Sequence, residues 1–229
     1  MVTQRGSNRD YVYNTVKDSI LNMRLKPGML ISEKEISERL QVSRTPTREA
    51  FIKLAEEELI VIYPQKGSFV SLIDMAQVEE ARFVRENMEV AVLNIACRSF
   101  SEKDLLDLEA LISQQVIYAG HDSYEKMHEL DEEFHRAIFY KCGKARTWNV
   151  IQQMLGHYKR FRNLLLEVYF DWETIILQHT RIVEYIRRRD FEMAERELRI
   201  HVKSRFEKDE LLKKYPNYFK ESAERSMQL

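Results

Sequence analysis

Two short helical patterns follow one another between Ser32 and Leu59, and only a brief break separates them. The first, SEKEISERL, begins with Ser32 and carries Glu35 three positions later, which is the spacing of a capping box. The second begins at Ser43 in VSRTPTREAF; Pro46 is tolerated in its first turn because the N–H that proline lacks has no helical partner there. Two short helices joined by so tight a turn predict a helix-turn-helix.

A β-hairpin is predicted directly after the second helix. The segments Ile60–Tyr63 and Phe69–Ile73 are mostly apolar or β-branched, and the residues PQKG between them are typical of a turn. A helical pattern over residues 8–24 precedes the pair of helices and ends before a Pro-Gly turn. We therefore expect residues 1–74 to form a winged helix-turn-helix domain.

The character of the chain changes after Asp74, where glycine nearly disappears and the apolar spacing becomes helical throughout. Helices are expected over residues 76–98, 102–117, 123–140, 145–170, 172–188 and 191–213. The polar tail after Tyr215 is expected to fray. Residues 75–229 are thus predicted to form an all-α bundle, which makes the whole chain mostly α.

Charge and cysteine content exclude several classes of protein. The 229-residue chain has a formal net charge of −1, so the total charge argues neither for nor against nucleic acid. Cys97 and Cys142 form no CxxC and are too few for a disulfide scaffold, which favours a reducing compartment. No stretch approaches the roughly 18 apolar residues that span a bilayer, and MVTQRGSNRD has no apolar signal core. We expect a cytoplasmic protein without a membrane role.

The start of the second helix concentrates groups that hydrogen-bond to DNA. Arginine pairs bidentately with guanine, Ser and Thr hydroxyls contact bases or phosphates, and free N–H groups at a helix N-terminus favour phosphate. The alternative is an ordinary capped surface helix with solvated arginines; the helix before it and the hairpin after it favour DNA. The predicted DNA-binding residues are Lys34, Ser43, Arg44, Thr45, Thr47, Arg48, Lys66 and Gly67.

The stretch LKPGMLISEKEISERLQVSRTPTREAFIKLAEEELI, followed by PQKGSFV, resembles the winged-helix domain of the GntR family of bacterial transcription regulators over about residues 10–73. The PG pair, the VSRTP-x-RE-A core and the glycine of the wing appear in the family's order. Thr47 stands where valine is commoner, and Glu58 stands where glycine is usual. The resemblance implies a homodimer that binds a palindromic operator in double-stranded DNA. It implies DNA contacts from Lys34, Arg44, Thr45, Arg48 and Gly67.

Three histidines stand in apolar helical stripes of the C-terminal part. Asp131 and His135 are four residues apart in LDEEFHRAIF and so project from one helix face, which His128 shares. His179 and His201 lie in two further stripes. Burying a carboxylate and three imidazoles is costly unless they are paired or bind a common ion, and a metal would satisfy all four. From spacing alone, satisfied core residues are the commoner interpretation, because periodicity does not show that the three segments converge.

The segments FVRENMEVAVLNIA, DEEFHRAIF and HTRIVEYIRRRDFEMAERELRIHV resemble the FCD ligand-binding domain of the FadR subfamily of GntR regulators over about residues 77–212. Many members carry one aspartate and three histidines as metal ligands. The matching residues here are Asp131, His135, His179 and His201. Arg85 and Glu89 match an arginine and a glutamate of the first helix, whereas Lys144 stands where asparagine is frequent.

Together these features predict a transcription regulator, with repression as the commoner polarity, whose operator affinity responds to a small carboxylate bound at a divalent metal ion. Mixed N/O ligation suits zinc, nickel or similar ions, and abundance favours zinc. Arg85 and Arg162 could pair with the far end of the carboxylate, although each could equally be a surface ion pair.

Two other functions remain open. In the first, the protein is a metal sensor and the ion itself is the signal. In the second, an enzyme uses the site to activate water. The enzyme is disfavoured because no extra general base is obvious beside the cluster and because a DNA-binding domain is attached.

Overall fold

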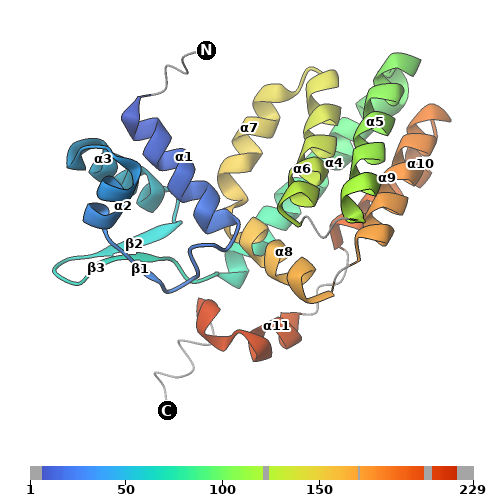
Figure 1. Ribbon diagram of the computed structural model, residues 1–229. Helices are drawn as coiled ribbons and strands as arrows, with labels where there is room; N and C mark the ends of the chain where they lie inside the picture. The colour runs from blue at the N-terminus through green and yellow to red at the C-terminus, as the bar shows by residue number, and fades with distance from the viewer. Residues whose placement is uncertain (1–6, 121–123, 170, 204–207, 221–229) are drawn as a thin grey trace. The chain divides into compact units, whose positions relative to one another are not determined.

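The computed structural model describes residues 7–120, 124–169, 171–203 and 208–220 (Figure 1). The described part is mostly helical with one small sheet, which confirms the predicted fold class. The chain divides into two compact units. The first comprises Met1–Glu79, Gln153–Val168 and Glu207–Leu229, and the second comprises Glu80–Gln152 and Tyr169–Phe206. The predicted division of the sequence after residue 74 stays a prediction.

The first unit begins with the elements of a winged helix-turn-helix (Figure 1). They are α1 (Asn8–Leu21), β1 (Leu30–Ile31), α2 (Glu33–Leu40), α3 (Arg44–Glu56), β2 (Ile60–Tyr63) and β3 (Gly67–Val70). The strands form one antiparallel sheet in the order β1-β3-β2. The sequence pattern did not predict β1, because two residues are too few to show a strand period.

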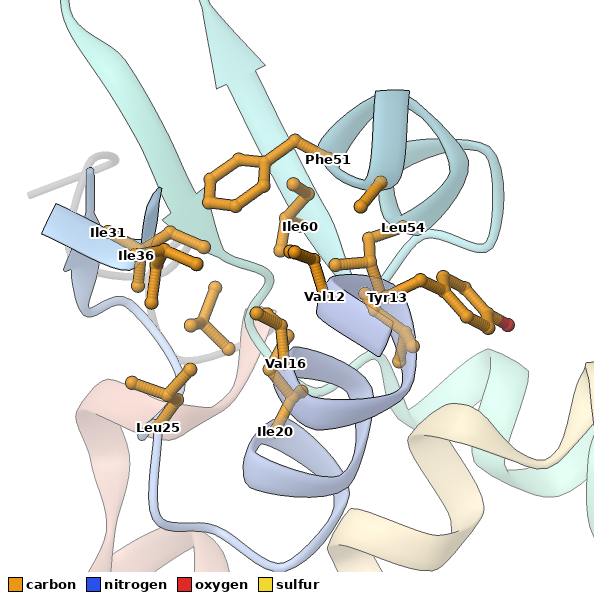
Figure 2. Packing of buried hydrophobic residues seen from close by; sticks show 13 residues of the cluster. Val12, Tyr13, Val16, Ile20, Leu25, Ile31, Ile36, Phe51, Leu54 and Ile60 are labelled. Atoms are coloured by element: carbon orange, nitrogen blue, oxygen red, sulfur yellow. The ribbon is translucent and has the colours of Figure 1, made fainter. Parts of the chain in front are cut away.

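Apolar side chains from α1, α3 and the sheet hold the recognition region in place. Figure 2 shows Val12 and Val16 of α1 packed beside Phe51, Leu54 and Ile60. Each fully buried side chain of this kind contributes about 1.5–3 kcal/mol. Since these anchors lie in the C-terminal half of α3, its N-terminal turn is left at the surface.

The predicted single helix over residues 145–170 is in fact two helices, α7 (Ala145–Met154) and α8 (Gly156–Tyr169). The second of them begins at Gly156, where an added Cβ would lie 2.8 Å from Cδ2 of Leu59. The glycine therefore allows the start of α8 to pack closely against the first unit's core. Apolar spacing alone could not show this break, because the stripe continues through it.

The expected fraying of the tail is wrong for residues 216–220. The tail segment contains α11 (Lys208–Lys214) and a 3-10 turn, Pro216–Tyr218. Ile73 then forms a parallel bridge with Phe219, which is fully buried and lies edge-on to Phe161. An aromatic side chain in a polar tail supplies enough apolar surface to anchor it.

The second unit is all-helical in its described residues. It contains most of α4 (Met75–Ser99) and of α7, together with α5 (Glu102–Ala119), α6 (Tyr124–Lys141), α9 (Trp172–Arg187) and α10 (Phe191–Lys203). Helix α5 packs against α6 and α9, and α10 packs against α9. The predicted continuation of the last helix to residue 213 falls on residues 204–207, which lie outside the described part. None of the described helices is long and apolar enough to cross a membrane.

Candidate DNA interface and metal centre

The N-terminal turn of α3 presents exposed hydrogen-bonding side chains. Ser43, Arg44, Thr45 and Arg48 are all exposed. Ser43 occupies the N-cap position, but its hydroxyl makes no capping hydrogen bond. Its hydroxyl and the free N–H groups of the first turn therefore face outward as a site suited to phosphate.

Thr47 is placed differently from its neighbours. It is fully buried, and its hydroxyl donates a hydrogen bond of 3.1 Å to the Ser43 carbonyl. Thr47 stands three and four residues before Ala50 and Phe51, so the helical period turns it towards the core. We leave it out of the DNA interface for that reason.

Three further predicted contacts are exposed as well. Lys34 on α2 is 64% exposed, with Nζ at 3.9 Å from the Glu38 carboxylate. Lys66 and Gly67 form the exposed tip between β2 and β3. Gly67 has a φ of +110°, and a Cβ there would lie 2.9 Å from Leu30 Cδ1, so the wing turn needs glycine at this position.

In the second unit, Asp131, His135, His179 and His201 converge from α6, α9 and α10. All four are buried, and one ligand atom of each lies within 4.8 Å of the others. Nε2 of His135 and Nε2 of His201 are 3.0 Å apart. Nε2 of His179 lies 3.6 Å from Asp131 Oδ1. The convergence that sequence spacing left open is therefore present in the fold.

Each of the three imidazoles has an oxygen acceptor at its other ring nitrogen. Nδ1 of His135 lies 3.0 Å from Glu89 Oε2. Nδ1 of His179 lies 2.9 Å from Gln115 Oε1, and Nδ1 of His201 lies 2.9 Å from Gln178 Oε1. Carboxylate and amide oxygens only accept, so each Nδ1 carries the proton and each Nε2 lone pair points into the cluster.

These four residues fit a divalent metal ion. Three imidazole lone pairs and a carboxylate directed at one buried point repel one another unless a cation lies between them. Asp131, His135, His179 and His201 would hold such an ion, which would neutralise this repulsion.

Arg85 and Glu89 form a buried chain behind His135. Arg85 Nε donates to Glu89 Oε1 at 2.6 Å, and NH1 donates to Glu132 Oε1 at 2.9 Å. Burial by itself would raise the pKa of Glu89, but its interactions with His135 and Arg85, which include a hydrogen bond from each, outweigh burial and lower the pKa to about 2. Glu89 is therefore ionised, and the Arg85 guanidinium already faces two carboxylates.

The sequence reasoning missed three residues of this site: Gln115, Gln178 and Glu132. Gln115 is fully buried, and its amide donates to the Leu130 carbonyl at 3.1 Å, which directs its oxygen at His179. A signal for it existed, since Gln115 continues the buried stripe of α5 after Leu105, Leu108 and Ile112. No pattern in the sequence points to Gln178 or Glu132. Each is the direct neighbour of a predicted metal ligand, His179 or Asp131, and so projects from a different side of its helix.

The remaining predicted residues lie apart from the cluster in different ways. His128 on α6 is not among its four members, and its ring lies edge-on to Trp172 with centroids 5.2 Å apart. Arg162 lies on α8 and belongs to the first compact unit, whereas the cluster belongs to the second. The effector-binding role of Arg162 stays a prediction.

A small cavity of about 10 Å³ lies beside the cluster. Glu89 and His135 supply its polar wall, and the rest of its lining is apolar, including Leu93, Phe134 and Leu198. The cavity has room for about one water molecule. A larger ligand would have to reshape it.

An exposed, basic recognition-helix start and a wing, joined to a helical unit, define a class of protein: a winged-helix DNA-binding regulator with a second, all-helical unit. Comparison with known proteins agrees with that class. Residues 8–70 match the bacterial regulatory proteins of the gntR family, and residues 80–204 match the FCD domain. The chain belongs to the GntR family and carries an FCD domain.

Individual relatives point the same way. The chain is 35% identical over 191 residues to the HTH-type transcriptional repressor RspR of Escherichia coli strain K12, covering 83% of this chain and 84% of that protein. The fold is that of E. coli McbR/YncC, with a TM-score of 0.77 at 20% identity over 94% of this chain and 100% of that one. A putative GntR regulator from Rhodococcus sp. RHA1 gives a TM-score of 0.70 at 20% identity over 86% and 94% of the two chains. The chain is a DNA-binding transcription regulator and not an enzyme.

Proposed function

We propose that this regulator is a repressor that holds a divalent metal ion, most simply zinc, and leaves its operator when a small carboxylate binds beside that ion. The observation that carries the proposal is the convergence of three buried imidazoles with Asp131, each imidazole oriented by an acceptor at Nδ1. Such outer partners set ring orientation and ligand basicity at metal sites. The repressive polarity is supported by the name of the relative RspR.

The ion would be held by Asp131, His135, His179 and His201. When bound, it would supply positive charge and open coordination positions for a carboxylate oxygen. The protein's own part is to orient the ligands and to keep the site dry. Since Arg85 is already bonded to Glu89 and Glu132, a carboxylate that approaches Arg85 competes with Glu132, which is the more exposed of the two acids. Effector binding is thereby tied to movement of α4 and α6.

The DNA-binding part of the proposal is a homodimer on a palindromic operator. Regulators of this family bind DNA and typically act as dimers. Arg44, Thr45 and Arg48 would read base edges from α3, while Lys34 and Lys66 would contact phosphates. We also keep the prediction that the protein works in the cytoplasm.

The first test is elemental analysis of the purified, untagged protein beside a His135→Ala, His179→Ala double variant. About one metal ion per chain, lost in the double variant and kept in His128→Ala on the same helix, is the expected result. The absence of metal from the wild-type protein would remove the metal centre from the proposal and leave the DNA-binding part standing.

The second test measures thermal stabilisation of the metal-loaded protein by malonate, succinate and citrate. Glu132→Gln should raise the affinity for the active carboxylate, because Arg85 then loses a charged competitor. Glu102→Gln, an exposed acid on α5, is the matched control. If metal alone changed DNA affinity and none of the carboxylates did, the ion itself would be the signal.

The third test measures DNA affinity with duplexes selected from a random-sequence library. Arg44→Ala or Arg48→Ala should weaken selected duplexes by about 1–3 kcal/mol and relax sequence preference, whereas Lys34→Ala should weaken all sequences and lower the salt slope by about one. Arg188→Ala, which changes an exposed arginine at the C-cap of α9, is the control. Unchanged binding in both α3 variants would overturn the assignment of the recognition helix.

A further inference from the structure

The three imidazoles of the metal centre face chemically different groups at Nδ1. One faces a carboxylate and two face side-chain amides. The pairs are His135 with Glu89, His179 with Gln115, and His201 with Gln178. A carboxylate oxygen only accepts a hydrogen bond, whereas an amide accepts through its oxygen and donates through its nitrogen. An amide therefore fixes the position of the ring proton only if it cannot rotate.

The amide of Gln115 is held against rotation. The side chain is fully buried, its nitrogen donates to the Leu130 carbonyl at 3.1 Å, and its oxygen lies 2.9 Å from Nδ1 of His179. A half-rotation would set the amide oxygen against the Leu130 carbonyl. Two acceptors that face each other in a core are costly, because neither is satisfied. His179 therefore keeps its proton on Nδ1.

The amide of Gln178 has no such second contact. The residue is 5% exposed, and its one hydrogen bond within the described part of the chain joins Oε1 to Nδ1 of His201 at 2.9 Å. A half-rotation exchanges the oxygen and the NH₂ group, which are nearly the same size, so the packing is kept. The nitrogen then donates to Nδ1 of His201, and the ring proton lies on Nε2.

The distance between two of the rings favours that rotation when no ion is bound. Nε2 of His135 and Nε2 of His201 are 3.0 Å apart, which is a hydrogen-bonding distance. His135 carries its proton on Nδ1, because that nitrogen faces the ionised carboxylate of Glu89. With its own proton on Nε2, His201 donates to His135. With the proton on Nδ1, two lone pairs face each other.

We propose that the amide of Gln178 rotates with the occupancy of the metal centre, donating to His201 in the metal-free protein and accepting from it in the metal-bound protein. Gln115 is the fixed holder of His179. The proton that leaves Nε2 of His201 is balanced by the one gained at Nδ1, so the ring stays neutral. This proposal rests on the metal centre of the proposed function and adds a positioning residue that responds to the ion.

The test locates the ring protons by nitrogen NMR of the full-length chain with isotope-labelled histidine, at about pH 8, where an ordinary imidazole is neutral. Each signal is assigned by the histidine substitution that removes it. In the metal-free protein the proton should lie on Nδ1 of His135 and His179 and on Nε2 of His201. Added zinc should move that of His201 to Nδ1. A proton on Nδ1 of His201 without metal would overturn the rotation.

A matched pair of variants separates the fixed amide from the rotating one. In metal-free Gln115→Met the proton of His179 should move to Nε2, where Asp131 Oδ1 lies 3.6 Å away. In metal-free Gln178→Met the proton of His201 should stay on Nε2. Opposite responses of this kind do not arise from a general loss of packing. The same response of both rings would overturn the distinction between the two amides.

Zinc affinity, measured by competition with a chelator, gives a second readout. Gln115→Met and Gln178→Met should each weaken zinc binding about 10–100-fold, because a ligand ring loses its acceptor. Gln114→Met, at an exposed position of α5, is the control and should bind zinc as wild type does. Circular dichroism establishes that each variant is folded.

Gln178→Glu keeps the test decisive if the methionine variants do not fold. A carboxylate cannot donate, so the proton of His201 should lie on Nδ1 with and without zinc. A proton on Nε2 of His201 in this variant would contradict the control of the ring by residue 178. A wild-type chain that takes up no zinc would overturn the metal centre together with the rotation. A chain that binds zinc while the proton of His201 stays in one place would overturn the rotation alone.

Discussion

Among the described residues, one arginine is buried in each compact unit, and the two charges are compensated in different ways. Arg85 in the second unit is 2% exposed and lies between two carboxylates, those of Glu89 and Glu132. Arg160 in the first unit is fully buried, and its hydrogen bonds go to neutral groups, the backbone carbonyl and hydroxyl of Ser71 and Nδ1 of His157. The positive charge of Arg85 is thus balanced by negative charges, whereas that of Arg160 is stabilised by the dipoles of neutral hydrogen-bond acceptors.

The difference assigns different tasks to the two arginines. Burial lowers the pKa of Arg160 to about 9, so its charge is held at a cost in free energy. The contacts that it makes join α8 to the segment after the wing, where Ser71 also donates to the Glu58 carbonyl at 2.6 Å. Arg85 instead belongs to a chain of charges that leads through Glu89 to His135 of the buried histidine cluster. The buried arginine therefore joins two backbone segments in the first unit, whereas in the second unit it lies behind the histidine cluster.

The largest effect is expected from removing a carboxylate beside Arg85. Glu89→Ala leaves a buried guanidinium with half of its charge balance and deprives His135 of its acceptor. Unfolding by urea should show a loss of about 3–5 kcal/mol, and metal affinity should fall about 10–100-fold. Glu102→Ala, an exposed acid, should cost less than about 1 kcal/mol. A loss that small for Glu89→Ala would show that Arg85 does not depend on this carboxylate.

Arg160→Met should cost less, about 1–3 kcal/mol, because it removes both the hydrogen bonds and the buried charge. The same urea titration measures it. A double-mutant cycle with Ser71→Ala should give a coupling energy above about 0.5 kcal/mol, since the two side chains are bonded at 3.1 Å. If Arg160→Met lost as much free energy of unfolding as Glu89→Ala, charge balance and neutral hydrogen bonding would not differ in their effect on stability.

The neutral partner of Arg160 makes stability depend on pH. Burial, and then the charge of Arg160, lower the pKa of His157 from 6.5 to about 3, against weaker opposing effects of Asp74 and the Glu58 carbonyl. Below pH 6.5 the unfolded chain binds a proton that the folded chain does not. Stability from this group is therefore complete above pH 6.5 and falls by about 1.4 kcal/mol per pH unit between pH 6.5 and 3.

The check is the stability of His157→Asn as a function of pH, measured beside wild type. Asparagine keeps an acceptor oxygen but does not titrate, so the slope between pH 6.5 and 5 should become shallower by about 1.4 kcal/mol per pH unit. Parallel profiles for the two proteins would mean that His157 is protonated in the fold and that Arg160 is held in some other way.

The smallest effect concerns Glu58, whose carbonyl accepts from Ser71. Its φ of 56° lies in the left-handed region, which costs a non-glycine residue about 1–2 kcal/mol. Glu58→Gly should therefore raise the free energy of unfolding by about 1 kcal/mol. Glu49→Gly, at an exposed position in the interior of α3, should lower it by about the same amount because glycine weakens a helix interior. If both variants changed the free energy of unfolding in the same direction, residue 58 would not be strained.

The sequence determined the parts of this protein that depend on local order along the chain. The caps, the tight turn and the hairpin chemistry predicted the winged helix, and the apolar period after Asp74 predicted the helical unit. The same period placed Asp131 and His135 on one face of α6, and Ala50 and Phe51 could have shown that Thr47 turns inward. These inferences succeed because neighbours within one helix have a geometry that the backbone dictates.

Only the tertiary structure decided which distant segments meet. It brought α6, α9 and α10 together so that the imidazoles of His135, His179 and His201 converge, and it supplied Gln115 and Gln178 to hold two of those rings. It also broke the helix before Gly156 and anchored Phe219 against the first unit. Such contacts depend on how separate apolar faces pack into one core, and the period of a single helix carries no information about its neighbours.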